Sequence, residues 1–107
     1  MKRVAIVGST GSIGQSALAV VAAHPDRLRV VALSAGENVP RLVEQSAEYA
    51  PDTVAMATAA GVAELEAGLR SAGAPLPARM ACGAEGLIAV ATHPDADVVL
   101  FASGEKH

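Results

Sequence analysis

The strongest chemical signal in the chain is a glycine-rich segment near the N-terminus. It reads Gly8-Ser9-Thr10-Gly11-Ser12-Ile13-Gly14. An apolar run, Val4–Val7, precedes this segment, and an alanine-rich apolar stretch, Ala17–Ala23, follows it. A strand, a glycine turn and a helix in this order form the arrangement that binds the pyrophosphate of a dinucleotide.

Backbone access explains why glycines suit this chemistry. The chain can turn sharply at Gly8, after Val7, and a phosphate can approach the main chain at Gly11, because glycine has no Cβ. At Gly14 the missing side chain lets the helix lie close to the strand. The first N–H groups of the helix then point at the phosphate oxygens, aided by the helix dipole. A glycine-rich turn without any ligand is the alternative interpretation.

A second landmark lies at the end of the next apolar run. A dinucleotide site often has an acidic residue about 20 positions further on, which holds the ribose 2′-OH. Counting from Gly14 reaches Ser34, and a serine leaves room for a 2′-phosphate. We expect Gly36, Glu37 and Asn38 to lie near that phosphate, although the Glu37 carboxylate repels it unless it points away. Alternatively, this loop is a plain connection in which Gly36 makes the turn and Asn38 caps a helix.

Strand and helix patterns alternate along the whole chain, which predicts an α/β fold. We expect a doubly wound, Rossmann-like, mostly parallel sheet of about five strands with helices on both faces. The expected strands are Arg3–Val7, Leu28–Ser34, Thr53–Met56, Arg79–Ala81 and Asp97–Ala102. The expected helices are Ser12–Ala23, Pro40–Tyr49, Ala59–Ser71 and Ala84–Thr92.

Length, charge and cysteine content narrow the class of protein. A chain of 107 residues is one domain at most, so residues 1–107 are predicted to form a single dinucleotide-binding domain. The net charge of −3 argues against a nucleic-acid partner. No apolar run approaches the ~18 residues of a membrane span. The single cysteine, Cys82, allows no internal disulfide, which favours the reducing cytoplasm.

A repeated tripeptide invites a catalytic or metal-binding interpretation. His24-Pro25-Asp26 and His93-Pro94-Asp95 each follow an expected helix. Both connections lead from a helix to a strand, so they belong at the amino edge of a parallel sheet, away from the edge that binds ligands. We therefore interpret both tripeptides as helix terminations.

Two of these segments together carry a family resemblance. The turn Gly8–Gly14 with Leu18, and then Ala35–Val39, resemble the start of the 1-deoxy-D-xylulose 5-phosphate reductoisomerases, from Met1 to about Phe101. The resemblance implies NADPH-dependent rearrangement and reduction to 2-C-methyl-D-erythritol 4-phosphate, in the non-mevalonate route to isoprenoid precursors. It also implies that Thr10, Gly11, Ser12 and Ile13 line the pyrophosphate, and that Gly36, Glu37 and Asn38 lie near the 2′-phosphate. The family often has a basic or small residue at position 37, which leaves the preference for NADPH over NADH open.

The resemblance also implies a longer enzyme. Members of the family are several hundred residues long, and their divalent-metal ligands (for Mg or Mn), phosphorylated-sugar site and lid lie beyond this chain. The intact enzyme is expected to be a cytoplasmic homo-oligomer. The chain alone is expected to be inactive and to self-associate or be only marginally stable. Ala102-Ser103-Gly104 lies either near the nicotinamide or at a plain terminus.

Two further functions compete with this hypothesis. The chain fits the cofactor domain of another NAD(P)-dependent dehydrogenase or epimerase, because these families also open with glycine turns. It also fits a stand-alone, non-catalytic nucleotide-binding module, which its short length favours.

Overall fold

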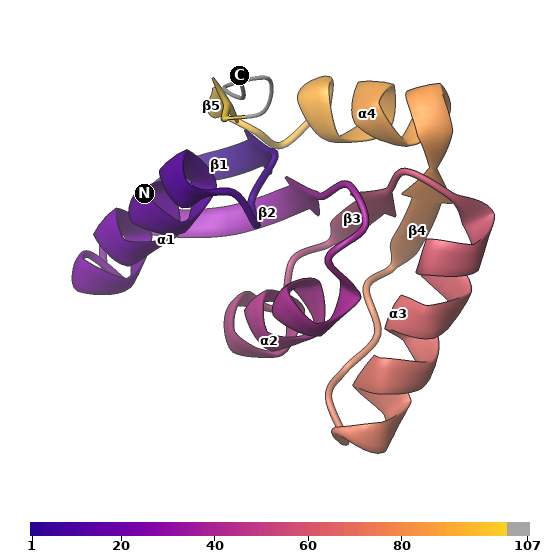
Figure 1. Cartoon of the computed structure of the whole chain (residues 1–107). Helices are drawn as coiled ribbons and strands as arrows, with labels where there is room; N and C mark the ends of the chain where they lie inside the picture. Colours follow the sequence, from indigo (N-terminus) through magenta and orange to yellow (C-terminus); the bar gives the residue numbers. More distant parts are fainter. Residues whose placement is uncertain (103–107) are drawn as a thin grey trace.

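The computed structural model describes residues 1–102, which alternate between strand and helix throughout. The strands are β1 (Lys2–Val7), β2 (Leu28–Ser34), β3 (Thr53–Met56), β4 (Arg79–Cys82) and β5 (Val98–Phe101). The helices are α1 (Ser12–Ala23), α2 (Val39–Tyr49), α3 (Ala59–Ser71) and α4 (Gly83–Ala91). All four strand pairs are parallel, in the spatial order β4-β3-β2-β1-β5 (Figure 1). The predicted Rossmann-like α/β fold is confirmed.

Every element expected from the sequence is present, and the boundaries differ by at most one residue. The second helix begins at Val39 rather than Pro40, because Asn38 is its N-cap. The fourth strand ends one residue later than expected, at Cys82. Helix α4 begins and ends one residue earlier than expected, at Gly83 and Ala91. The last strand is shorter than expected, although Asp97 and Ala102 still donate backbone hydrogen bonds to β1, at 2.8 and 2.7 Å. Ser103 and Gly104 lie outside the described residues.

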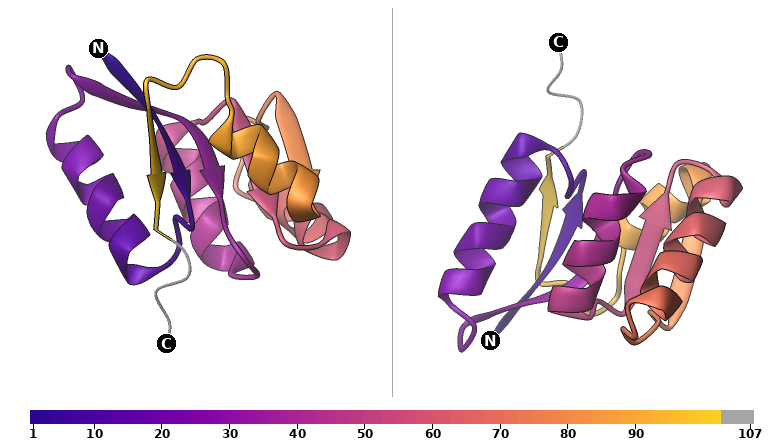
Figure 2. Two further views of the ribbon diagram at one scale, coloured as in Figure 1. Left: turned by 90° about the horizontal axis from the view of Figure 1, so that it is seen from above. Right: turned by 60° about the horizontal axis from the view of Figure 1, so that its bottom comes forward.

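The helices cover the two faces of the sheet unequally. Figure 2 shows α1, α2 and α3 on one face and α4 on the other, as right-handed crossovers require for this strand order. The larger apolar core lies under α1–α3 and includes Ile6, Leu33 and Leu65. A smaller core lies under α4 and includes Val31, Ala32 and Val90.

An irregularity between β1 and β2 decides which residues face each other at the end of the sheet. Val4 pairs with Val30, but Ala5 pairs with Ala32, so β2 contains one extra residue at this point. As a result, Val31 and the adjacent Ala32 both belong to the α4-side core, although neighbouring residues of a regular strand point to opposite faces. The shift also brings Ser34 level with Val7 at the carboxyl edge.

The second His-Pro-Asp segment fastens the opposite, amino edge of the sheet. His93 is buried, and its Nδ1 accepts a hydrogen bond from the Asp95 backbone N–H at 3.1 Å. Its Nε2 must therefore carry the proton that reaches the Asp52 carboxylate at 3.0 Å. These contacts join the end of α4 to the residue before β3. They agree with the structural interpretation of this segment.

Strand β5 leaves apolar surface uncovered. Val98 and Leu100 are partly exposed, and the Phe101 side chain is 70% exposed. A largely apolar groove of about 330 Å³ runs between α1 and β5, where Val20 and Leu100 face it. This surface supports the expectation of self-association, which stays a prediction.

The pair of His93 and Asp52 makes stability depend on pH. The hydrogen bond from His93 holds the pKa of Asp52 below its ordinary value of 3.8. A carboxyl group with a lowered folded pKa contributes stability above its unfolded pKa, and loses it as the pH falls through the folded value. Asp52→Asn should therefore lower the free energy of unfolding at neutral pH. Its difference from the parent should shrink as the pH falls below 3.8.

Urea unfolding of both proteins across the acid range measures this difference. Asp26→Asn, at an exposed aspartate in another helix-to-strand connection, is the matched control. A difference between Asp52→Asn and the parent that stays constant with pH would contradict the assignment.

Candidate dinucleotide-binding site

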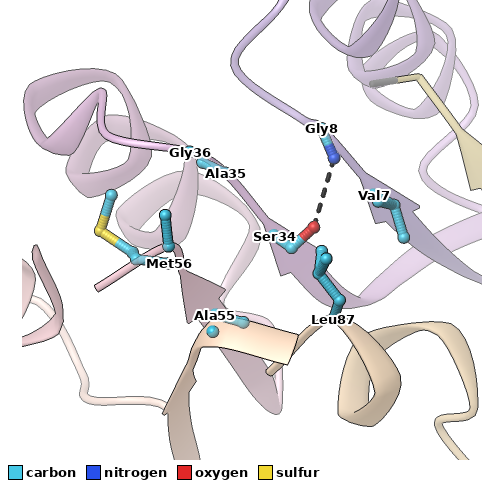
Figure 3. Close-up of a pocket in the computed structure, with 10 residues that line it drawn as sticks. Val7, Gly8, Ser34, Ala35, Gly36, Ala55, Met56 and Leu87 are labelled. Atoms are coloured by element: carbon cyan, nitrogen blue, oxygen red, sulfur yellow. Dashed lines mark hydrogen bonds between the residues drawn. The ribbon is translucent and has the colours of Figure 1, made fainter. Parts of the chain in front are cut away.

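The turn after β1 is held by backbone hydrogen bonds to the end of β2. The N–H groups of Gly8 and Ser9 both donate to the Ser34 carbonyl oxygen, at 2.9 and 2.8 Å. Gly8 N also lies 3.3 Å from the Ser34 hydroxyl oxygen (Figure 3). Gly8 has a φ of +86°, in the left-handed region that favours glycine. A glycine is therefore required where the sequence predicted the sharp turn.

The helix after this turn lies directly on the turn's backbone. A Cβ built at Gly14 would lie 2.3 Å from the Gly8 carbonyl oxygen and 2.6 Å from the Ser9 Cα. Both contacts are far inside van der Waals distance, and backbone atoms cannot move aside as a flexible side chain can. The sequence predicted that Gly14 lets the helix lie close to the strand, and the structure shows this close approach at Gly8 and Ser9, directly after the strand.

The first turn of α1 has the features of an anion site. Gly11 is the N-cap, so it supplies no side-chain acceptor, and its carbonyl accepts from Gln15 N at 2.9 Å. Ser12 and Ile13 are exposed, and Thr10 and Gly11 are half-buried. A helix N-terminus whose amides are not capped by a side chain can bind phosphate through those amides.

The loop after β2 lies beside this turn. Gly36, Glu37 and Asn38 are all exposed. The Gly36 carbonyl accepts a hydrogen bond from Ala57 N at 3.0 Å, which fixes the loop against the end of β3. The Asn38 side chain accepts from Arg41 N at 3.2 Å, so the predicted cap is confirmed.

Gly36 lies in the bend between β2 and α2, as the plain-connection interpretation expected, but the backbone there does not require a glycine. Among residues 1–102, the glycines with positive φ are Gly8, Gly73 and Gly83, so Gly36 adopts a backbone conformation open to other residues. A Cβ at Gly36 would meet no atom within 4 Å. Its small size leaves open space beside the main chain.

A cavity of about 280 Å³ lies between the glycine turn and this loop, at the carboxyl ends of β1, β2 and β3 (Figure 3). Ligands of open α/β sheets bind at this edge. The walls are mostly apolar, which suits a flat aromatic ring. The lining residues are Val7, Gly8, Ser34, Ala35, Gly36, Ala55, Met56, Ala57, Gly83 and Leu87.

The sequence did not reveal the main role of Ser34. The residue is 1% exposed, and both of its oxygens face the Gly8 turn, so it positions the turn as well as lining the cavity. A small polar residue closing an apolar strand next to a glycine turn is the signal that could have shown this. Met56, Ala57 and Leu87 were also not expected at the site.

Residues 1–102 contain no group of three or more His, Cys, Asp or Glu side chains arranged to hold a metal ion. Within the same part of the chain, no helix is both long enough and apolar enough to cross a membrane.

Comparison with known proteins identifies the family. The family model of 1-deoxy-D-xylulose 5-phosphate reductoisomerase matches residues 4–104. The chain belongs to this family. The match decides against the other dehydrogenase and epimerase families that the glycine turn also allowed.

Curated reductoisomerases give the extent of the likeness. The protein of Symbiobacterium thermophilum is 48% identical over 99 residues, which cover 92% of this chain and 26% of that protein. The protein of Anaeromyxobacter sp. (strain K) is 48% identical over 102 residues, which cover 95% of this chain and 25% of that protein. The chain thus spans about a quarter of the length of these relatives.

Solved reductoisomerases share the fold. A DOX-P reductoisomerase in complex with NADPH, fosmidomycin and magnesium matches 92% of this chain and 24% of its own, with a TM-score of 0.82 and 33% identity. The reductoisomerase from Zymomonas mobilis in complex with NADPH also matches 92% of this chain and 24% of its own, with a TM-score of 0.79 and 31% identity.

The contact at Gly14 leads to a stability prediction. Gly14→Ala should lower the free energy of unfolding by about 1–3 kcal/mol, because its Cβ overlaps the Gly8 carbonyl. Gly36→Ala has open space and should change stability by less than ~1 kcal/mol, through a less flexible unfolded chain. Urea denaturation compares the two. A Gly14→Ala protein as stable as Gly36→Ala would show that α1 is not seated on the turn.

Proposed function

We propose that residues 1–107 form the NADPH-binding domain of a 1-deoxy-D-xylulose 5-phosphate reductoisomerase. The observation that carries the proposal is the Gly8–Gly14 turn, fastened to Ser34 at the carboxyl edge of the sheet and followed by an exposed helix N-terminus. Support comes from the family match and from the likeness to reductoisomerases solved with NADPH.

In this proposal the glycine turn takes the cofactor's pyrophosphate. The main chain at Gly8, Thr10, Gly11, Ser12, Ile13 and Gly14 surrounds the phosphate oxygens, which the α1 dipole attracts. The adenine ring occupies the apolar cavity between this turn and the Gly36 loop, where Met56 and Leu87 supply apolar walls. The cavity adjoins both the turn and the loop, so one extended dinucleotide can reach all three places.

The loop Gly36, Glu37 and Asn38 takes the adenosine ribose and its 2′-phosphate. Glu37 opposes this phosphate electrostatically, whereas the N-terminus of α2 favours it. Arg41 lies in the first turn of α2 with its side chain 46% exposed, and its 3.9 Å pairing with Glu44 is loose. Arg41 is therefore the cation nearest in sequence that can turn toward the phosphate. This residue was not expected from the sequence.

The longer enzyme would divide its labour between this domain and the rest. NADPH, when bound, supplies the hydride that reduces the product of rearrangement of a phosphorylated sugar. In this proposal the divalent metal (Mg or Mn) and the substrate phosphate are bound by the other part of the enzyme. We place the intact enzyme in the cytoplasm as a homo-oligomer, and we expect the 107-residue chain alone to be inactive. A stand-alone nucleotide-binding module is the second candidate.

Calorimetric titration of the purified chain with NADPH, and separately with NADH, tests the proposal. We expect saturable binding that favours NADPH, because the turn and the Gly36 loop are both formed without the rest of the enzyme. Circular dichroism verifies that the sample is folded. Binding that favours NADH, or no binding to a folded sample, would contradict the proposal.

Charge reversal at position 37 tests the placement of the 2′-phosphate. Glu37→Lys should tighten NADPH binding about tenfold, because it replaces repulsion by attraction at an exposed site. NADH has no 2′-phosphate, so its affinity should change by less than about twofold.

Asp26→Lys makes the same charge change at an exposed loop on the amino edge of the sheet, and it is the matched control. The gain for Glu37→Lys should diminish at high salt. An equal gain for NADPH and NADH, or an equal gain in the control, would place the 2′-phosphate elsewhere.

A further inference from the structure

A buried polar pair connects α2 to the glycine turn. The Ser9 hydroxyl donates to Gln45 Oε1 at 2.7 Å, and Gln45 Nε2 donates to the Ser9 carbonyl oxygen at 2.9 Å. The two residues are 36 positions apart in the chain. Ser9 is fully buried and Gln45 is 6% exposed. A carbonyl can only accept, so the amide of Gln45 has one orientation that satisfies both bonds.

These bonds complete the constraints on Ser9. Its N–H is held by the Ser34 carbonyl of β2, whereas its hydroxyl and its carbonyl are held by Gln45 of α2. The next carbonyl along the turn, that of Thr10, accepts from Gln15 Nε2 at 2.8 Å. Two successive carbonyl groups of the turn therefore rest on glutamine amides.

The direction of these carbonyls matters for an anion. A carbonyl oxygen carries partial negative charge and repels phosphate, whereas a peptide N–H attracts it. In a planar trans peptide the C=O and the following N–H point in opposite directions. Holding the Ser9 carbonyl against α2 therefore directs the Thr10 N–H away from α2.

One partner in this pair is the main-chain carbonyl of Ser9, which no substitution can replace. An apolar residue at position 45 would leave this buried acceptor without a hydrogen bond, which costs stability. It would also lose direction, because an apolar side chain cannot distinguish a carbonyl from an N–H.

The same helix carries the other half of the proposed site. Helix α2 begins directly after Asn38, so Gln45 lies on the helix that follows the Gly36–Asn38 loop. One helical turn further on, the Tyr49 hydroxyl donates to the Leu18 carbonyl of α1 at 3.0 Å. That bond joins α2 to α1 without contacting the turn.

We infer that Gln45 is a positioning residue, which orients the Ser9–Thr10 peptide so that its N–H rather than its carbonyl faces a bound diphosphate. The inference rests on the proposed dinucleotide-binding function. If it holds, Gln45, a buried residue of α2, affects the binding of the pyrophosphate part of the ligand and of no other part.

Three variants separate this role from a general loss of packing. Gln45→Met keeps the length of the side chain and removes both hydrogen bonds. Ser9→Ala removes only the hydroxyl bond and leaves the carbonyl held. Tyr49→Phe removes a hydrogen bond between α2 and α1, and it is the matched control on the same helix.

Two ligands report on different parts of the site. NADPH contains the diphosphate, whereas adenosine 2′-monophosphate contains only the adenosine and the 2′-phosphate. We expect Gln45→Met to weaken NADPH binding about tenfold, through two lost hydrogen bonds, and Ser9→Ala to weaken it less. Binding of adenosine 2′-monophosphate should change by less than about twofold in every variant, as should NADPH binding to Tyr49→Phe.

Amide hydrogen exchange of the ligand-free chain provides an independent reading. Exchange in segment 8–12 should be about tenfold faster in Gln45→Met than in Tyr49→Phe, because Gln45 bonds to the turn whereas Tyr49 bonds to Leu18 of α1. A folded Gln45→Met with parental NADPH affinity, or with equal losses for both ligands, would overturn the inference.

If Gln45→Met does not fold, Ser9→Ala provides the test in its place. Unchanged NADPH affinity together with unchanged amide exchange in Ser9→Ala would then overturn the inference. If the parent binds neither ligand, the proposed function fails. In that case the exchange rates still decide whether Gln45 orients the turn.

Discussion

The carbonyl group of Ser34 is the point on which the candidate site depends. It accepts the N–H groups of two successive residues, Gly8 and Ser9, and so joins the exit of β1 to the end of β2. This pairing is possible because β2 contains an extra residue beside Val4 and Ala5, which brings Ser34 level with Val7. An irregularity inside the sheet thereby sets the geometry of the turn at its edge.

From that point outward, the site is built mainly of backbone. Helix α1 can lie on the turn only because Gly14 has no side chain, and the open space at Gly36 adjoins a loop that β3 holds through Ala57. Small residues and main-chain bonds leave few rotatable groups to be ordered when a ligand binds. A preformed site of this kind loses little conformational entropy on binding.

The sequence predicted what depends on neighbours along the chain. Apolar runs, glycine turns and caps such as Asn38 gave every element to within one residue. It did not reveal contacts that cross the fold, such as the shift in β2, the bond from Gly8 to Ser34 and the bond between His93 and Asp52. Local patterns contain no information about such partners. The sequence predicted a turn at Gly36, but it does not say whether a glycine serves backbone conformation or open space there.

The place of β5 beside β1 has a consequence for the order of folding. Arg3 and Asp97 bond to each other across 94 positions, so β1 gains its second neighbour only when β5 arrives. Contacts of such long sequence separation slow folding and make it cooperative. During synthesis, β1 can pair only with β2 until residues 98–101 have left the ribosome, so one of its two edges has no partner strand until then. Strand β1 thus has both edges paired only after the three strands that follow it, β2, β3 and β4, have been made.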